Sequence, residues 1–555
     1  MVAVPITPMG VSLCLGLITP YLSKLIIDQA YARKDLRLFI ILVIAAAAVF
    51  TINSAVNMRI SFLNRSIKLS IAFTLNRKVF KKLQYLPYRF FQDTSTGQHL
   101  YKIAYDIERV AQLIADIFPQ AIFIIPKAFL IFGIVFYLDS KIALFSLALL
   151  PFLCISPVYF MIQLKKKIKL WVEKSQAIFE RASEVLSHIQ LVKAFGKEKR
   201  EIKSYILALI HNTRQELANM KLELSGSFLS SISQRVILGL IIFYAGLRVM
   251  QGRLTLGGFS AITLYLAQLS GLQNILASSL QRISLGLVSC ERLDSVLAIT
   301  VEPRIKEGAR QVVFPAGRIE FKNVTFGYLP DKMVLEDLSF CIEAGSCVGI
   351  MGNSGCGKTT AINLILGLYK PTRGEILIDG FNIDSVKPDS FYGQVAIATQ
   401  EPYLWNDTIE NNIRYAKEGA TLKEIEEAAR IACIDAFIDS LADGYQTVVG
   451  ESACRISEGQ KQRIAIARAV IKKPKILILD EALNSVDVEL EVKIITNLRR
   501  ELKDSTLIVV SHRLSTINMA DAIYFFAGAG KIDIGRHQEL LQRNTQYQAY
   551  LSLHS

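Results

Sequence analysis

The sequence predicts a multidomain membrane protein, with an all-α transmembrane domain of six helices followed by an α/β domain. Two observations support this fold class. Long apolar runs recur through the first half of the chain, and short β-branched segments alternate with helical segments in the second. With 555 residues, 51% of them hydrophobic and only 20% charged, the chain is too long for one ordinary domain and too apolar for a purely soluble one.

Six apolar runs can cross a membrane. The hydrocarbon core of a bilayer is about 30 Å thick and needs about 20 apolar residues of helix. The first run lacks a basic segment and a cleavage site, so we expect a membrane helix and not a signal peptide. Six spans bring both termini to the same side. The predicted spans are Val2–Ile26, Leu38–Val56, Phe118–Leu138, Ile142–Ile162, Val236–Val249 with an earlier start, and Phe259–Leu276.

Basic residues gather in the two long connections between spans. The net charge is +14, but it lies beside apolar runs, so we expect membrane topology and no nucleic-acid partner. Lys and Arg accumulate on the cytoplasmic side, which places both connections and both termini in the cytoplasm. Helical periodicity continues at Ile178, Ala182 and Val185, so helices are expected to extend beyond the bilayer. The outer loops, near Asp28–Arg37, Asp139–Lys141 and Gln251–Thr255, are then short.

A polar segment with Pro303, Gly308 and Pro315 indicates a linker. We therefore expect a transmembrane domain over residues 1–299, a linker over 300–317 and a second domain over 318–555. Strands such as Arg318–Val324 and Ile476–Leu479 alternate there with helical stretches such as 422–432. This order predicts a mostly parallel core sheet.

A glycine-rich loop, GNSGCGKTT, follows a predicted strand at 347–351 and precedes a helical run. Backbone amides of such a loop wrap phosphates, Lys358 reaches the β and γ phosphates, and the hydroxyl of Thr359 binds Mg²⁺. The motif predicts a phosphate-binding loop. Its residues are Gly352, Asn353, Ser354, Gly355, Cys356, Gly357, Lys358, Thr359 and Thr360.

The apolar segment ILILDE ends in two acids, Asp480 and Glu481. A buried strand would deliver both to the phosphate loop, where Asp480 would hold Mg²⁺ and Glu481 would act as general base. Two exposed acids at a strand end are the structural alternative, which the nearby phosphate loop disfavours. The motifs together predict an ATPase.

With these motifs the chain resembles a half-transporter of the ABC superfamily, of the exporter type with the membrane domain first. The resemblance implies that Tyr328, in VTFGY, stacks on adenine. It implies that Gln400, in ATQEP, links the Mg²⁺-nucleotide to the membrane domain, and that His512, in SHRLS, contacts the γ phosphate.

The segment ISEGQKQR resembles the family signature LSGGQ, which closes over ATP held by a second subunit and so implies a dimer. Ser457, Gly459 and Gln460 match the signature, whereas Glu458 replaces its first glycine. An acid pointing inward could slow closure. We favour a solvent-directed Glu458, because a helix N-terminus accepts an acid well. In NSVD, Asp487 of the family's D-loop is retained.

The membrane half resembles exporters in two segments, residues 90–110 and 182–201. The resemblance implies coupling helices that touch the ATPase domain near Asp93–Gly97 and near a turn after Glu201. Such exporters commonly have an amphipathic helix before the first span, which here begins almost at Met1.

Two features bear on the substrate. Lys127 lies near the middle of the third span, where a charge is costly, and either contacts an anionic substrate group or pairs internally. The sixth span is rich in polar residues, so it either lines the path or packs on other helices. These residues are Gln268, Ser270, Gln273, Asn274, Ser278, Ser279 and Gln281.

The predicted function is ATP-driven export or flipping of a hydrophobic or amphipathic substrate, a lipid, drug or peptide. The cofactors would be ATP and Mg²⁺, the partner a second half-transporter, preferably a second copy, and the location the cytoplasmic membrane. An importer on the exporter fold, or an ATP-gated channel-like relative, is the alternative. The six spans exclude a soluble ABC ATPase.

Overall fold

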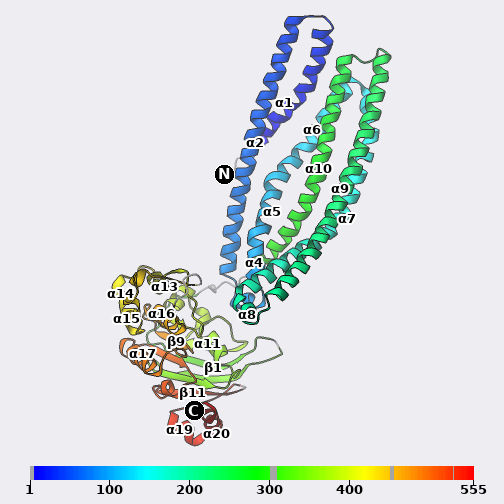
Figure 1. Cartoon of the computed structure of the whole chain (residues 1–555). Coiled ribbons are helices and arrows are strands. Elements are labelled where there is room, and N and C mark those ends of the chain that lie inside the picture. Colours follow the sequence, from blue (N-terminus) through cyan, green and yellow to red (C-terminus); the bar gives the residue numbers. More distant parts are fainter. Residues whose placement is uncertain are drawn as a thin grey trace. The chain divides into compact units, whose positions relative to one another are not determined.

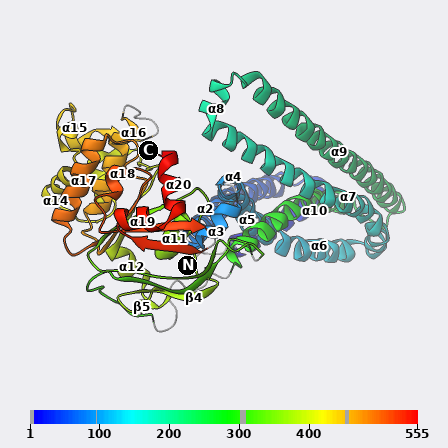
Figure 2. The same ribbon diagram turned by 90° about the horizontal axis from the view of Figure 1, so that it is seen from below.

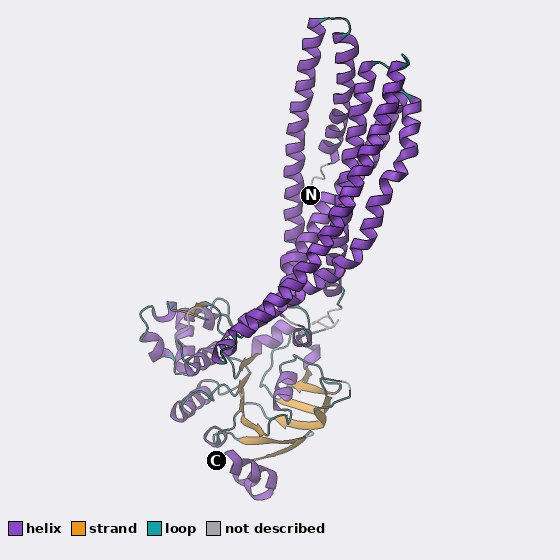
Figure 3. Cartoon of the chain, turned by 45° about the vertical axis from the view of Figure 1, so that its right-hand side comes forward, coloured by secondary structure: helices purple, strands orange, loops and turns teal. Residues whose placement is uncertain are grey.

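The computed structural model describes residues 6–94, 96–299, 309–329, 331–450, 456–528 and 530–554. The chain divides into two compact units, one with residues 1–86 and 90–300, the other with residues 87–89 and 301–555. Figure 1 follows the chain from blue to red. Figure 3 shows that the first unit is helical and that the strands belong to the second.

Long helices build the first unit (Figure 1, blue to green). A core of apolar side chains from four of them, among them Ile131, Ile142, Ile241 and Tyr265, holds it together. The long helices are α1 (Ile6–Leu25), α2 (Leu36–Gln84), α6 (Phe118–Leu138), α7 (Ser140–Ser187), α9 (Glu198–Met250) and α10 (Leu256–Leu297). The shorter elements of this half are η1 (Ile26–Tyr31), α3 (Tyr88–Asp93), α4 (Thr96–Tyr101), η2 (Lys102–Asp106), α5 (Ile107–Gln112), η3 (Leu113–Ile117) and α8 (Ile189–Ala194).

The predicted spans lie within these long helices, apart from Ile26, which begins η1, and the first residues of the chain, which fall outside the described part. Helices α2, α7 and α9, of 49, 48 and 53 residues, exceed the length that a bilayer needs, so they extend beyond it. Among the described residues, four helical stretches are long and apolar enough to span: Thr7–Tyr31, Leu36–Gln84, Gly97–Leu138 and Glu198–Met250. Helices α7 and α10 contain shorter apolar stretches, Ser140–Leu149 and Leu256–Leu272.

Two aspartates fasten helix ends where the predicted outer loops lie. Asp139 accepts hydrogen bonds from the first amides of α7, and its other oxygen binds the Arg248 guanidinium at 2.7 and 2.9 Å. Asp28 accepts from the amide of Gly257 and the hydroxyl of Thr255 at the start of α10. A carboxylate at a helix N-terminus satisfies free amides and opposes the helix dipole, which explains why these loops can be short.

The connection between α7 and α9 corrects one prediction. The turn lies at residues 195–197, and Glu201 belongs to the first turns of α9. Gly196 adopts a φ of +57°, which glycine accepts without strain. Acidic Glu198 and Glu201 favour a helix N-terminus at this point. The predicted turn after Glu201 is therefore wrong.

Two main sheets frame the second unit. The larger has the order β12-β11-β3-β10-β9-β6, with parallel pairing except for the antiparallel edge strand β12, which confirms the predicted parallel core. The smaller, antiparallel sheet has the order β2-β1-β4-β5 and contains the strand predicted at 318–324. The strands are β1 (Ile319–Phe326), β2 (Leu335–Ile342), β3 (Cys347–Gly352), β4 (Arg373–Ile378), β5 (Phe381–Asn382), β6 (Val395–Ala398), β7 (Asp407–Thr408), β8 (Val448–Val449), β9 (Ile476–Asp480), β10 (Thr506–Val510), β11 (Ala522–Gly528) and β12 (Lys531–Gly535).

Helices cover the parallel sheet, which explains why its strands are continuously apolar. Figure 2 shows α14 to α17 grouped on one side of this unit, away from β4 and β5. The helices are α11 (Lys358–Ile365), α12 (Pro388–Gln394), α13 (Ile409–Arg414), α14 (Leu422–Ile431), α15 (Asp435–Asp439), α16 (Glu458–Val470), α17 (Val488–Glu501), α18 (Leu514–Ile517), α19 (His537–Arg543) and α20 (Thr545–His554), with short 3-10 turns η4 (Ile383–Ser385) and η5 (Gly444–Gln446).

Candidate functional site

The phosphate loop, the acidic pair and the histidine converge at one edge of the parallel sheet. Strands β3, β10 and β9 are neighbours, with Val510 paired to Ile350 on one side and to Asp480 on the other. The phosphate loop follows β3, the acids close β9, and His512 follows β10. Ligands of open α/β sheets bind outside the carboxyl ends of the strands, so this edge is the expected site.

The phosphate loop needs its glycines. Gly352, Gly355 and Gly357 have φ values of +144°, +80° and +104°, which side chains disfavour. A Cβ on Gly352 would also lie 2.5 Å from the carbonyl oxygen of Phe526. The ammonium of Lys358 donates to the carbonyl oxygens of Gly352, at 2.6 Å, and Asn353, at 3.0 Å, which holds it inside the loop. The loop opens α11, whose N-terminal amides favour an anion.

Other loop residues differ in exposure. Asn353, Ser354, Gly355 and Thr359 are exposed. The remaining side chains, Cys356 and Thr360, are buried.

Glu481, directly after β9, and His512, after β10, meet directly. Glu481 Oε1 lies 3.0 Å from His512 Nε2, and Glu481 Oε2 accepts a hydrogen bond from the amide of Asn484, also at 3.0 Å. Glu481 has a φ of +51°, an unfavourable value for a residue other than glycine. Both carboxylate oxygens of Glu481 are thus held by contacts.

The surroundings of Asp480 fit a cation. Burial raises the pKa of Asp480, the neighbouring Glu481 raises it further, and Lys358 opposes both. Two adjacent carboxylates repel each other, so a divalent cation would stabilise them. Within the described part of the chain, no three His, Cys, Asp or Glu side chains gather as a metal site. Mg²⁺ commonly uses one or two protein ligands together with substrate phosphates and water, and therefore needs no such cluster.

The predicted signature begins α16. Ser457 caps this helix, because its hydroxyl accepts from the amide of Gln460 while the Gln460 side chain accepts from the amide of Ser457. Glu458 lies 3.3 Å from Lys461, and its side chain is 49% exposed. In this subunit Glu458 is therefore directed to solvent and a basic neighbour, which supports the expected solvent-directed orientation.

Gly459→Ala is expected to lower ATP turnover at least about tenfold. A Cβ at this position would lie 2.6 Å from the carbonyl oxygen of Ser485, so the backbone of the segment 484–487 would have to move. Gly393→Ala is the control, because space is open around Gly393. Steady-state hydrolysis in lipid measures both variants, and equal activity of Gly459→Ala and the unmodified protein would contradict the prediction.

Three residues implied by the family resemblance occupy different surroundings. Tyr328 packs edge-on against Tyr369, with ring centroids 5.2 Å apart, and its hydroxyl lies 3.2 Å from that of Thr360. Gln400 is exposed. Asp487 is exposed and precedes α17, without a side-chain hydrogen bond to that helix.

A buried glutamine, which the sequence analysis missed, connects the motifs. Gln462 is 1% exposed. Its amide donates to the carbonyl oxygen of Gln400 at 3.3 Å, and its oxygen accepts from the amide of Ser485 at 3.1 Å. The sequence signal that could have identified Gln462 is its position as a polar residue on the apolar side of α16.

A buried ion pair was missed as well. Arg513 donates to Glu491, at 2.9 Å, and to the carbonyl oxygens of Asn484 and Val486, both at 2.6 Å. Glu491 is fully buried. The pair therefore fixes the segment 484–487 beside the histidine.

In the helical unit, Lys127 lies on α6 and is half-buried, and among the described residues it has no ion-pair partner. Gln268 donates to the carbonyl oxygen of Gly16 at 2.9 Å, so this polar residue packs on α1. Ser270 is half-buried and Ser279 buried. The side chains of Gln273, Asn274, Ser278 and Gln281 lie outside the described part.

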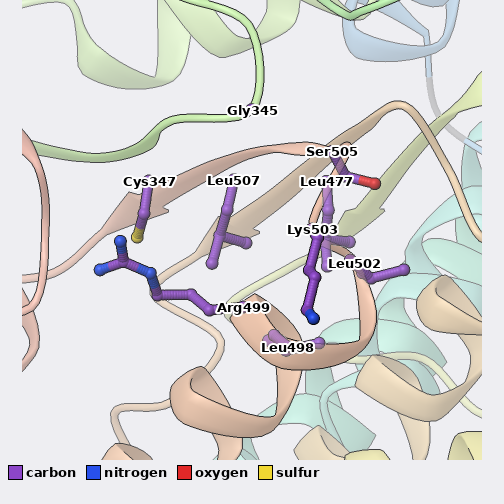
Figure 4. A pocket seen from close by; sticks show the side chains of 9 residues that line it. All are labelled: Gly345, Cys347, Leu477, Leu498, Arg499, Leu502, Lys503, Ser505 and Leu507. Carbon is purple, nitrogen blue, oxygen red and sulfur yellow. The ribbon is translucent and has the colours of Figure 1, made fainter.

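A cavity of about 170 Å³ lies at the opposite edge of the parallel sheet. Cys347 and Leu507, near the beginnings of β3 and β10, line it together with Arg499 and Lys503 (Figure 4). Arg499 is bound to Asp521 at 2.8 Å, and burial raises the pKa of Cys347 to about 11. This cavity is separate from the predicted phosphate site.

Comparison with known proteins covers both units. A family model described as ABC transporter transmembrane region matches residues 8–273, and one described as ABC transporter matches residues 335–484. The chain is 32% identical over 535 residues to an ATP-dependent lipid A-core flippase of Legionella pneumophila (strain Paris), covering 95% of this chain and 89% of that protein.

Two further similarities extend over nearly the whole length. The chain is 31% identical over 548 residues to the putative multidrug export ATP-binding/permease protein YgaD of Bacillus subtilis (strain 168), covering 97% of this chain and 94% of that protein. It is also similar to the solved structure of a bacterial Atm1-family ABC exporter with ATP bound. The TM-score is 0.87 at 28% identity, and the match covers 99% of this chain and 98% of that one.

Proposed function

The chain belongs to the ABC transporter superfamily, as an exporter-type half-transporter, and from that premise we propose its domain limits, its reacting residues and its substrate class. It is a multi-pass membrane protein that binds ATP, couples ATP hydrolysis to export or flipping across a membrane, and acts as a dimer. The transmembrane domain takes residues 1–299, the linker 300–317 and the nucleotide-binding domain 318–555.

ATP binds at the carboxyl edge of the parallel sheet. The amides of 352–360 and the ammonium of Lys358 hold the phosphates, and Tyr328 turns from Tyr369 to stack on adenine. Thr359, Gln400 and Asp480 hold Mg²⁺, which neutralises phosphate charge when bound. The repulsion between Asp480 and Glu481 supports this assignment.

Glu481 is the general base for hydrolysis. Its carboxylate takes a proton from the attacking water. His512 Nε2, which lies 3.0 Å from Glu481 Oε1 in this structure, contacts the γ phosphate when ATP is bound. The convergence of Lys358, Asp480, Glu481 and His512 at one sheet edge is the observation that carries this proposal.

The dimer contains two copies of this chain. Ser457, Gly459, Gln460 and Asp487 of each copy close over ATP held by the other. Differential binding of ATP to the closed state biases the equilibrium, and coupling helices near Asp93–Gly97 pass the change to the membrane helices. A heterodimer with another half-transporter is the alternative, which the mass of the purified complex decides.

The substrate is an amphipathic lipid with an anionic headgroup, flipped in the cytoplasmic membrane. The carrying observation is Lys127, a half-buried charge in a membrane-spanning helix without an ion-pair partner among the described residues. The full-length similarity to a lipid A-core flippase supports a lipid, whereas the similarity to YgaD favours a hydrophobic drug.

Lys127→Met is expected to lower lipid-stimulated hydrolysis at least about tenfold, because a charge-assisted contact contributes about 1.5 to 3 kcal/mol. The protein is placed in phosphatidylcholine vesicles, and a fluorescent anionic phospholipid is compared with its zwitterionic counterpart for stimulation and for ATP-dependent flipping. Lys141→Met, at an exposed lysine beyond the end of the same span, is the control and should behave as the unmodified protein. Equal stimulation of Lys127→Met and the control would refute the lipid contact. Stimulation by drugs alone would favour the second candidate.

A further inference from the structure

The last helix of the chain reaches the hydrolytic site. Tyr550 of α20 is 2% exposed and packs against Phe525 of β11, with ring centroids 5.7 Å apart. Its hydroxyl forms a hydrogen bond with His512 Nδ1, and the two rings lie 6.2 Å apart. The two nitrogens of His512 thus have different partners, since Nε2 faces Glu481 at 3.0 Å.

The chemistry of these partners fixes the positions of the protons. An ionised carboxylate only accepts hydrogen bonds, so Nε2 must donate to Glu481. In a neutral imidazole the other nitrogen then carries no proton and accepts, so the hydroxyl of Tyr550 must donate to Nδ1. Burial, together with the nearby Cys356 and Glu481, raises the pKa of Tyr550 to about 12, so this donor keeps its proton at neutral pH.

We propose that Tyr550 is a positioning residue that fixes the tautomer of His512 with its proton on Nε2. The inference rests on the proposed role of His512 in hydrolysis. Phosphate oxygens only accept hydrogen bonds, so the tautomer that Tyr550 selects is the one whose Nε2 proton can bind the γ phosphate. The opposite tautomer would present a lone pair to the phosphate and repel it. Helix α20 therefore contributes a positioning residue to the ATP site.

Tyr550→Phe tests the proposal, because it removes the hydroxyl and keeps the ring that packs on Phe525. Loss of one neutral hydrogen bond is expected to lower kcat about fivefold in the full-length protein in lipid, with KM for ATP nearly unchanged. The matched control is Tyr547→Phe. Tyr547 lies on the same helix, is fully buried, and its hydroxyl lies 2.9 Å from Nδ1 of His537. An unchanged kcat in Tyr550→Phe, or the same loss in both variants, would overturn the proposal.

A second measurement determines which ring nitrogen of His512 carries the proton. The chain has six histidines, so nitrogen NMR of ¹⁵N-histidine-labelled protein in lipid can separate their rings, and His512→Gln assigns the signals of His512. We expect an unprotonated Nδ1 and a protonated Nε2 in the unmodified protein, and a smaller fraction of this tautomer in Tyr550→Phe, where Glu481 alone still favours it. A proton on Nδ1 of the unmodified protein would overturn the proposal.

The two measurements separate this proposal from the proposed hydrolytic role. Unimpaired hydrolysis by Glu481→Gln would remove the assigned general base, yet the tautomer would still be read by NMR. A normal loss in Glu481→Gln, together with an unaffected Tyr550→Phe, would remove only the role of Tyr550.

Discussion

Glu481→Gln is expected to lower ATP turnover by a factor of about 10² to 10⁴ in the full-length protein in lipid, because a positioned general base contributes about this much. Glutamine preserves the size of the side chain, and its oxygen can still accept one of the two hydrogen bonds, from His512 or from Asn484, that hold Glu481 at 3.0 Å. It has no basic oxygen to take a proton from water. The binding of ATP should therefore persist while hydrolysis stops.

Three measurements in one sample make this result decisive: the rate of phosphate release, the affinity for ATP and the mass of the complex. Glu489→Gln, at an exposed acid in the first turn of α17, is the control and should keep full activity. A dimeric protein with Glu481-dependent hydrolysis would support a self-sufficient homodimer that tolerates Glu458. Retention of more than about a tenth of the turnover in Glu481→Gln would mean that another group activates the water.

The helices that contain the predicted spans were predictable because their signal is local. A run of about 20 apolar residues has few alternatives to a spanning helix, and Asp139 supplies a helix cap between two such runs. The predicted span at 118–138 accordingly coincides with α6. The turn before α9 was misplaced because Gly196 and two acids determine it, whereas the prediction followed the end of a family segment.

The pairing of the strands could be predicted only in part from local sequence patterns. Alternating strands and helices predicted a parallel core, and the pairing of β9, β10 and β3 confirms it. The segment of β1 has the same β-branched character, yet it belongs to the antiparallel sheet. Strand propensity describes a segment, whereas its partner depends on the packing of the whole domain.

The candidate site likewise contains residues that the sequence predicts and contacts that it does not predict. The phosphate loop and the acids after β9 are contiguous motifs, so their residue types and spacing indicate their chemistry directly from the sequence. The contacts of Gln462 with Ser485 and of His512 with Tyr550 join residues 23 and 38 positions apart. Neither motif spacing nor periodicity encodes such contacts, because they depend on how α16 and α20 pack against the segments that follow β9 and β10.

Arg513→Met is expected to destabilise the nucleotide-binding domain by about 3 kcal/mol, because it leaves the fully buried Glu491 without its cation. Burial raises the pKa of Glu491, and Arg513 opposes that shift at 2.9 Å. Without Arg513 the carboxylate must either stay charged in an apolar environment or take up a proton. Thermal unfolding followed by calorimetry, in lipid and without nucleotide, measures the loss.

The same variant has a predictable dependence on pH. A carboxyl group whose pKa is raised in the folded state favours folding when it is protonated, and this contribution is lost as the pH rises through the folded pKa. The destabilisation by Arg513→Met should therefore be larger at pH 8 than at pH 5. Arg500→Met is the control, since Arg500 pairs with Glu501 at 2.9 Å on the surface, and exposed pairs contribute at most about 1 kcal/mol.

The double variant Glu491→Met with Arg513→Met separates the two roles of Arg513. Removing both charges should restore most of the stability, because an apolar pair of similar size can replace a buried ion pair. ATP turnover should nevertheless be lower than in the unmodified protein, because Arg513 also holds the carbonyl oxygens of Asn484 and Val486 in the segment that follows Glu481. Recovery of both stability and turnover would show that the ion pair alone matters, whereas recovery of neither would place the stabilisation in the carbonyl contacts.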